Sequence, residues 1–150
     1  MKRTISITML LFILIIAGCD KKAEEPQYDI YENHDISACG INDPLQNIVW
    51  LKEYCQSINK TREFLSVYVN LYNVVGKENE NIFYVRYSTD GINFISSQLY
   101  CINCNSDTIF HFGWLMGKGN FYPELPPLPL YYEFMKDKEF VAELFHFVKH

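Results

Sequence analysis

The chain has 150 residues, of which 49% are hydrophobic and 16% aromatic, and this is enough apolar surface for the core of one ordinary domain. That composition excludes wholesale disorder, a collagen-like repeat and a bare coiled coil. The formal net charge of -5 argues against a general nucleic-acid binder, because such proteins use Lys and Arg to displace counterions from phosphates. We therefore expect one globular domain without a nucleic-acid partner.

The first residues have the layout of a secretory signal peptide. Lys2 and Arg3 make a short positive start, and an apolar run from Ile5 to Ala17 follows with few interruptions. This run is shorter than the ~20 apolar residues that a membrane-spanning helix needs. We therefore predict that residues 1–18 are a signal peptide that is removed.

The end of this segment carries a lipidation signal. Ile16-Ala17-Gly18-Cys19 resembles a bacterial lipobox, in which a dedicated peptidase cuts before the cysteine and the new terminal cysteine carries lipid. Acyl chains contribute ~0.8 kcal/mol per buried CH₂, and more than one chain gives stable anchoring. The resemblance implies a lipoprotein that is anchored through Cys19 to the bacterial outer membrane without crossing it.

The segment after the lipidated cysteine is polar. Residues 19–37 contain many charged side chains and Pro26, and this composition predicts a flexible tether before a single globular domain over residues 38–150. The stretch Lys21-Lys22-Ala23-Glu24-Glu25 resembles the acidic export signals of Bacteroidetes surface lipoproteins. That resemblance implies exposure at the cell surface, with simple retention facing the periplasm as the alternative.

The globular domain opens with a predicted helix. Asp43 is a suitable N-cap, Pro44 has the preset φ of a first helical position, and Gln46 stands where a capping-box partner belongs. Apolar residues then recur at steps of three and four up to the expected end near Asn59. The stripe that we expect to face the core consists of Leu45, Ile48, Leu51, Cys55 and Ile58, and it is widened by Val49 and Tyr54.

The same region carries a family resemblance. Cys39-Gly40, Pro44-Leu45 and the run from Trp50 to Glu53 form the pattern C-G-x₃-P-L-x₄-W-L-K-E. This pattern resembles the opening of a family of small, uncharacterised Bacteroidetes lipoproteins. The resemblance implies a lone small domain in the envelope and carries no catalytic residue.

After this helix the hydrophobic period changes from about 3.6 to 2, which predicts strands. The alternation predicts strands over 64–72, 82–87, 92–100 and 108–116, and the Asp90-Gly91 pair predicts a tight turn. Short connections between these runs favour an antiparallel meander.

The end of the chain predicts a loop and a second helix. Four prolines within 119–130 favour a loop with polyproline character. A helix is expected to open at Asp137, with a buried stripe made of Phe140, Val141, Leu144, Phe145 and Val148. The predicted fold is therefore α+β, a small antiparallel sheet of about four strands with an N-terminal and a C-terminal helix packed on one face.

Four cysteines remain after lipidation, namely Cys39, Cys55, Cys101 and Cys104. An even number in an exported chain first suggests disulfides, and four cysteines allow three pairings. Unpaired thiols, a zinc site that includes His111, and a redox pair in the Cys101-x-x-Cys104 turn are the alternatives. The segment after Cys104 is predicted to be turn and strand, whereas thioredoxin-like motifs open a helix.

The sequence gives only weak signals for other site residues. His34, His111, His146 and His150 match no metal-binding pattern, and no phosphate loop or nucleophile elbow is present. The tyrosines at 68, 72, 84, 87 and 100, with Trp114, are expected on the sheet faces, where amphipathic rings suit recognition. The sequence therefore favours a non-enzymatic domain that binds a protein or a glycan, without a cofactor, and the thiol- or zinc-dependent protein is the alternative.

Overall fold

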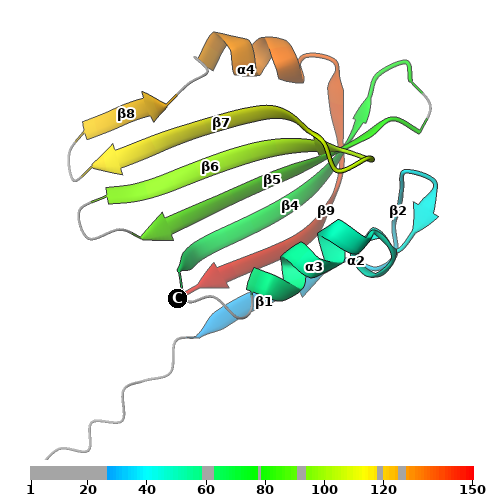
Figure 1. The fold of residues 1–150 in the computed structure, drawn as a ribbon, viewed down its shortest axis with the longest axis horizontal. Coiled ribbons are helices and arrows are strands. Elements are labelled where there is room, and N and C mark those ends of the chain that lie inside the picture. Colours follow the sequence, from blue (N-terminus) through cyan, green and yellow to red (C-terminus); the bar gives the residue numbers. More distant parts are fainter. Residues whose placement is uncertain (1–26, 59–62, 78, 91–93, 118–119, 125–127) are drawn as a thin grey trace, which may run out of the picture.

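The computed structural model describes most of the chain beyond the predicted signal peptide. Its described residues form nine strands and three helices (Figure 1). The signal peptide, Cys19 and the predicted export signal lie outside this part. The described ranges are 27–58, 63–77, 79–90, 94–117, 120–124 and 128–150.

Seven of the strands form one antiparallel sheet in the order β1-β9-β4-β5-β6-β7-β8. The four predicted strands are present and pair in sequence as a meander. The predicted α+β fold with a sheet of about four strands is nevertheless wrong, because three further strands extend this sheet. The meander strands are β4 (Phe64–Val74), β5 (Asn81–Asp90), β6 (Phe94–Asn103) and β7 (Thr108–Gly117).

The predicted C-terminal helix is the long strand β9 (Lys138–Lys149), which pairs with β4. Two register shifts against β4 leave Val141 and Leu144 as extra residues in β9, as in a β-bulge. Each bulge adds an apolar residue directly beside another one in the sequence. The apolar residues of β9 therefore recur at steps of three and four. This spacing imitates a helical stripe, although the segment is rich in the aromatic and β-branched residues that favour strands.

The proline-rich segment is also more regular than predicted. Residues Asn120–Glu124 form β8 at the edge of the sheet, and Leu128–Met135 form helix α4. Pro123 is tolerated because an edge strand leaves its outer groups unpaired, and Pro129 lies in the first turn of α4, where its missing N–H has no helical partner.

The predicted N-terminal helix is present but broken in two. Helix α2 (Pro44–Asn47) and helix α3 (Val49–Ile58) meet at Ile48, whose backbone is extended. Asp43 precedes α2 with a left-handed φ of 48° and makes no side-chain cap. The five main positions of the predicted apolar stripe are confirmed, because all five side chains are buried. The prediction is wrong for Val49, which is 69% exposed.

Part of the predicted tether belongs to the sheet. Residues Tyr28–Glu32 form strand β1, which pairs with the end of β9. A separate two-stranded hairpin follows, made of β2 (Ser37–Ala38) and β3 (Ile41–Asn42). The folded part of the chain therefore begins before the expected boundary at residue 38.

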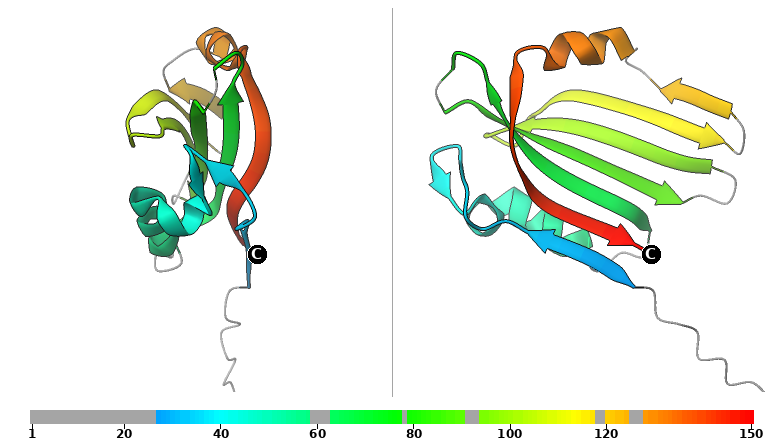
Figure 2. Two further views of the ribbon diagram at one scale, coloured as in Figure 1. Left: turned by 90° about the vertical axis from the view of Figure 1, so that its right-hand side faces the viewer. Right: turned by 180° about the vertical axis from the view of Figure 1, so that it is seen from behind.

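The two longer helices lie at different ends of the sheet (Figures 1 and 2). Helix α3 shares the larger core with residues such as Val69, Phe83 and Phe145. Helix α4 packs against a second core that includes Leu99 and Phe112. Since strand residues alternate between faces, these cores lie on opposite faces of the sheet, which we call the α3 face and the α4 face. The predicted packing of two helices on one face is therefore wrong, because the predicted C-terminal helix is strand β9 and helix α4 lies on the face opposite to α3.

Candidate functional site

The α4 face carries a line of side chains away from helix α4. Tyr31 of β1 pairs with His146 of β9, His146 with Tyr68 of β4, and Tyr68 with Arg86 of β5. Because all four residues are direct cross-strand partners, their side chains stand side by side on one face. We call these four residues the cross-strand row.

The members of the row are in ring contact. The ring centroids of Tyr31 and His146 are 5.4 Å apart and those of Tyr68 and His146 are 5.9 Å apart. The Arg86 guanidinium carbon lies 4.7 Å from the centroid of the Tyr68 ring, a cation–π contact. Tyr31 is 41% exposed and Arg86 is also exposed, so both ends of the row are accessible.

Two carboxylates flank the row at His146. Glu143 Oε1 is 2.6 Å from His146 Nδ1, and Asp29 Oδ2 is 3.5 Å from His146 Nε2. The His146 side chain is 21% exposed. With a carboxylate facing each ring nitrogen, this histidine is positioned by acids rather than paired with a nucleophile, so the geometry gives no support to a catalytic triad.

A second set of polar groups borders the row. Asn70 stands opposite Tyr84 and Glu143, and its buried Oδ1 has no hydrogen-bond partner among the described residues. Tyr84 Oη is 3.2 Å from Tyr131 Oη of helix α4. Burial raises the pKa of Tyr84, and the hydrogen bond to Tyr131 adds to this rise. The hydroxyl therefore stays protonated at neutral pH and can donate as well as accept.

The predicted tyrosines divide between the two faces. Tyr68, Tyr72 and Tyr84 lie on the α4 face, where Tyr72 and Tyr84 have ring centroids 5.5 Å apart. Tyr87 and Tyr100 lie on the α3 face, and Tyr100 stacks on His111 at 4.3 Å. The side chain of Trp114 lies outside the described part of the chain.

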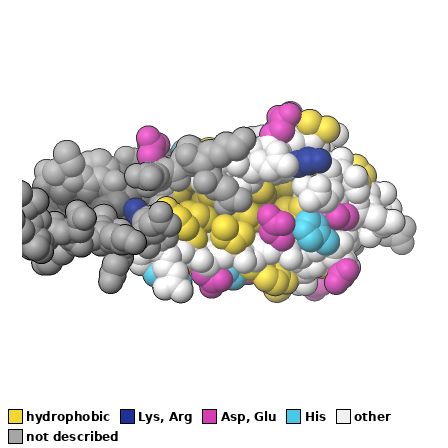
Figure 3. Space-filling model, turned by 90° about the horizontal axis from the view of Figure 1, so that it is seen from below, with side chains coloured by type: hydrophobic (Ala, Val, Ile, Leu, Met, Phe, Trp, Pro, Cys, Tyr) yellow, Lys and Arg dark blue, Asp and Glu magenta, His cyan; other side chains and the backbone are white. Residues whose placement is uncertain are grey.

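The remaining histidines are in different surroundings. His34 stands between two carboxylates, with Nδ1 2.9 Å from Asp43 Oδ1 and Nε2 3.2 Å from Glu32 Oε2. Figure 3 shows histidine and acidic side chains side by side on the face of the molecule seen from below. His150 is exposed at the end of β9.

One predicted disulfide is present. Cys39 Sγ and Cys104 Sγ are 2.06 Å apart, which ties the β2–β3 hairpin to the turn after β6. Cys55 and Cys101 are free and buried, and burial raises the pKa of each thiol to about 12. A thiol with such a pKa is a poor nucleophile at neutral pH.

The alternative site at the Cys101-x-x-Cys104 turn is not assembled. Cys104 is bonded to Cys39, whereas Cys101 is buried in the core under α4. Over the described ranges, no group of three or more His, Cys, Asp or Glu side chains is arranged to hold a metal ion. The four cysteines therefore act in this structure as one cross-link and two buried apolar side chains.

Sequence reasoning missed most of the cross-strand row. His146 was expected in a helix and Tyr31 in the tether, so nothing placed them beside Tyr68. The position of Arg86 was predictable from the sequence, because the alternation of β5 puts it on the same face as Tyr84.

No family model, no curated protein and no solved structure matches the chain. Within the described residues, no helix is long and apolar enough to cross a membrane.

Proposed function

We propose that the protein is a lipoprotein, anchored through Cys19, whose folded domain binds a glycan without catalysing a reaction. The anchor rests on the basic start, the apolar run and the lipobox-like residues before Cys19. A tether of few residues then joins the lipid to β1, so the sheet would be held close to the membrane surface.

The observation that carries the binding function is the cross-strand row. It places three rings and a guanidinium in one line on the α4 face, with both ends accessible. Aromatic rings offer apolar contact to the C–H faces of a sugar, and planar side chains such as Arg, Asn and Glu offer paired hydrogen bonds to its hydroxyls. Specific ligand sites combine such apolar contact with a few well-placed polar groups.

The row is also long enough for an oligosaccharide. Neighbouring strands are about 4.8 Å apart, so a row across four strands spans about 14 Å. This length exceeds one pyranose ring and favours a chain of sugars over a monosaccharide. The flanking Glu143 and Asp29 add acceptors along the same line.

Strand β1 offers a matched pair of tyrosines for the test. Tyr31 and Tyr28 are each 41% exposed, but Tyr31 belongs to the row whereas Tyr28 stacks on Phe147 on the α3 face. We expect Tyr31→Ala to weaken binding of the purified, detergent-solubilised lipoprotein to its best ligand on a glycan array by about tenfold, or about 1.4 kcal/mol. Tyr28→Ala is expected to bind as the wild type does.

The same array can contradict the proposal. Equal losses in both variants would show that the effect comes from the edge strand and not from the row. The folded wild type binding no glycan on the array would contradict a glycan ligand. Capture of a protein on the immobilised lipoprotein would then indicate a protein ligand instead.

A further inference from the structure

Arg86 differs from the other charged groups on this face because no ion pair of the described residues includes it. Its guanidinium lies over the face of the Tyr68 ring. The guanidinium carries five N–H donors, and these match a carboxylate in a fork geometry.

The groups around Arg86 are uncharged. Its cross-strand partners are Tyr68 and Leu99, and Tyr84 and Ser88 precede and follow it on the same face of β5. Ser88 Oγ is 2.7 Å from Ser97 Oγ on β6, so this hydroxyl pair keeps one hydrogen free to donate. An anion at Arg86 would therefore meet further donors and no acid on the adjacent strand positions.

The two carboxylates of the site lie at His146 and not beside Arg86. Both face His146, which lies two strands from Arg86, about 10 Å away. That distance exceeds the screening length of about 8 Å at physiological ionic strength, so these acids weaken anion binding at Arg86 only slightly. An unpaired cation on an accessible face stands out in a chain whose net charge is -5.

We propose that Arg86 binds the carboxylate of an acidic sugar, so that the preferred ligand is a uronic-acid-containing oligosaccharide. This inference rests on the proposed glycan-binding function and adds the class of sugar. The carboxylate accepts paired hydrogen bonds from the Arg86 guanidinium, the Ser88–Ser97 pair donates to a neighbouring oxygen, and the sugar chain runs along the row toward Tyr31.

Titration calorimetry with two probes that differ at the carboxyl group tests this inference. The probes are an oligogalacturonate and the same oligosaccharide with its carboxylates methyl-esterified. We expect the wild-type lipoprotein to bind the acid at least about tenfold more tightly than the ester, and raised salt to reduce this preference. In Arg86→Gln the two affinities should lie within about threefold of each other, mainly through weaker binding of the acid.

Two further variants separate the effect of the guanidinium geometry from that of positive charge alone. Arg86→Lys keeps the charge without the fork and should show an intermediate preference. Lys149→Gln removes one positive charge from the neighbourhood of Tyr28, on the α3 face, and should keep the wild-type preference. An unchanged thermal unfolding temperature shows that each variant is folded. If Arg86→Gln does not fold, Arg86→Lys alone provides the test.

The outcomes separate the two proposals. Equal binding of acid and ester by the wild type, or a preference that stays at the wild-type level in the folded Arg86 variants, would overturn the role of Arg86 and leave the glycan-binding function standing. Binding of neither probe, together with an empty glycan array, would overturn the proposed function itself.

Discussion

At the scale of single residues, His34 holds two parts of the fold together. Its ring nitrogens contact Glu32 at the end of β1 and Asp43 before helix α2. The hydrogen bond with Asp43, and then that with Glu32, raise the pKa of His34 above 6.5. Asp43 is thereby engaged by the histidine and does not cap α2.

This contact predicts a pH-dependent part of the stability. A histidine whose pKa is higher in the folded state stabilises the fold below pH 6.5, and this contribution is lost as the pH rises through the folded-state pKa. The contact is exposed, so we expect at most about 1 kcal/mol. Urea unfolding at pH 5.5 and pH 8.5 should show a smaller acid-side gain in His34→Gln than in the wild type, and an identical gain would contradict the role.

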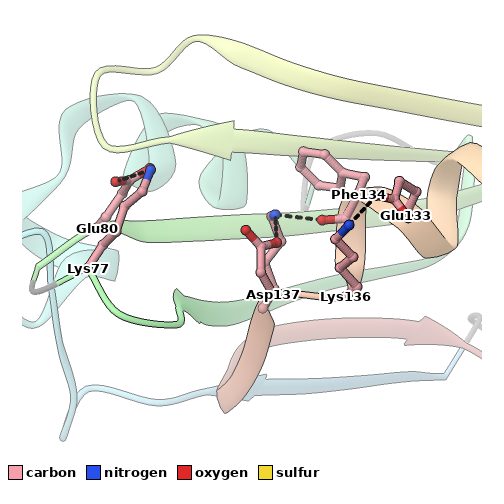
Figure 4. A network of polar contacts seen from close by, with 7 residues as sticks. Lys77, Glu80, Glu133, Phe134, Lys136 and Asp137 are labelled. Carbon is pink, nitrogen blue, oxygen red and sulfur yellow. Dashed lines mark hydrogen bonds and ion pairs between the residues drawn. The ribbon is translucent and has the colours of Figure 1, made fainter.

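At the scale of elements, two lysines after the end of α4 differ in burial and in their contacts. Lys138 Nζ donates to Phe134 O at 2.5 Å and also contacts Asp137, and its side chain is only 8% exposed. Lys136 pairs with Glu133 through side chains that are both more than 60% exposed. Figure 4 shows Glu133, Phe134, Lys136 and Asp137 grouped around this corner.

The difference in burial predicts different energetic effects. Lys138→Met keeps the buried stem but leaves a C-terminal carbonyl of α4 without its cationic donor, and we expect the free energy of unfolding to fall by about 1–2 kcal/mol. Lys136→Met should leave it nearly unchanged, as for exposed ion pairs. Urea denaturation of both variants measures this, and equal effects would show that Lys138 does not secure the helix.

The disulfide joins elements that are distant in the chain. Cys39 and Cys104 are 65 residues apart, and the backbone N–H of Cys39 also donates to Asn81 Oδ1 at 2.5 Å. Closing a loop of this length restricts the unfolded chain, so we expect Cys39→Ser with Cys104→Ser to lower the free energy of unfolding by about 4 kcal/mol. Denaturant titration measures this loss.

Alkylation provides the control for that experiment. Native wild-type protein should take up little iodoacetamide at pH 8, because Cys55 and Cys101 are buried and their pKa is raised. Unfolded, non-reduced protein should be labelled at these two cysteines only, as read by peptide mass spectrometry. Labelling at Cys39 or Cys104 without reduction would contradict the cross-link.

At the scale of the whole molecule, the predicted anchor decides where the domain acts. Cys19→Ser removes the thiol that the predicted lipid would occupy, so the variant should no longer partition with membranes or incorporate labelled palmitate. Cys55→Ser, a change at a buried thiol, should leave the label in place. A Cys19→Ser protein that still fractionates with membranes would contradict the lipobox interpretation.

Much of the local structure was predictable because it depends on short-range periodicity. The period-2 runs place β4 to β7 close to where they lie, and the stripe from Leu45 to Ile58 marks the buried side of α2 and α3. These patterns need no knowledge of distant partners, because each strand or helix exposes its own alternation of apolar and polar side chains. Composition and the N-terminal signals likewise lead to the prediction of an exported single domain.

Long-range pairing decided the rest. The bulges of β9 are set by its register against β4, and without that partner its apolar spacing imitates a helix. The alignment of Tyr31, His146, Tyr68 and Arg86 follows from the strand order β1-β9-β4-β5, which pairs the first described strand with the last. The bond between Cys39 and Cys104 likewise depends on how the sheet brings the β2–β3 hairpin to the turn after β6. The sequence by itself determined β4 to β7 and the buried stripe of α2 and α3, whereas only the tertiary structure decided the character of β9 and which side chains share a face, because strand register is fixed by contacts between distant segments.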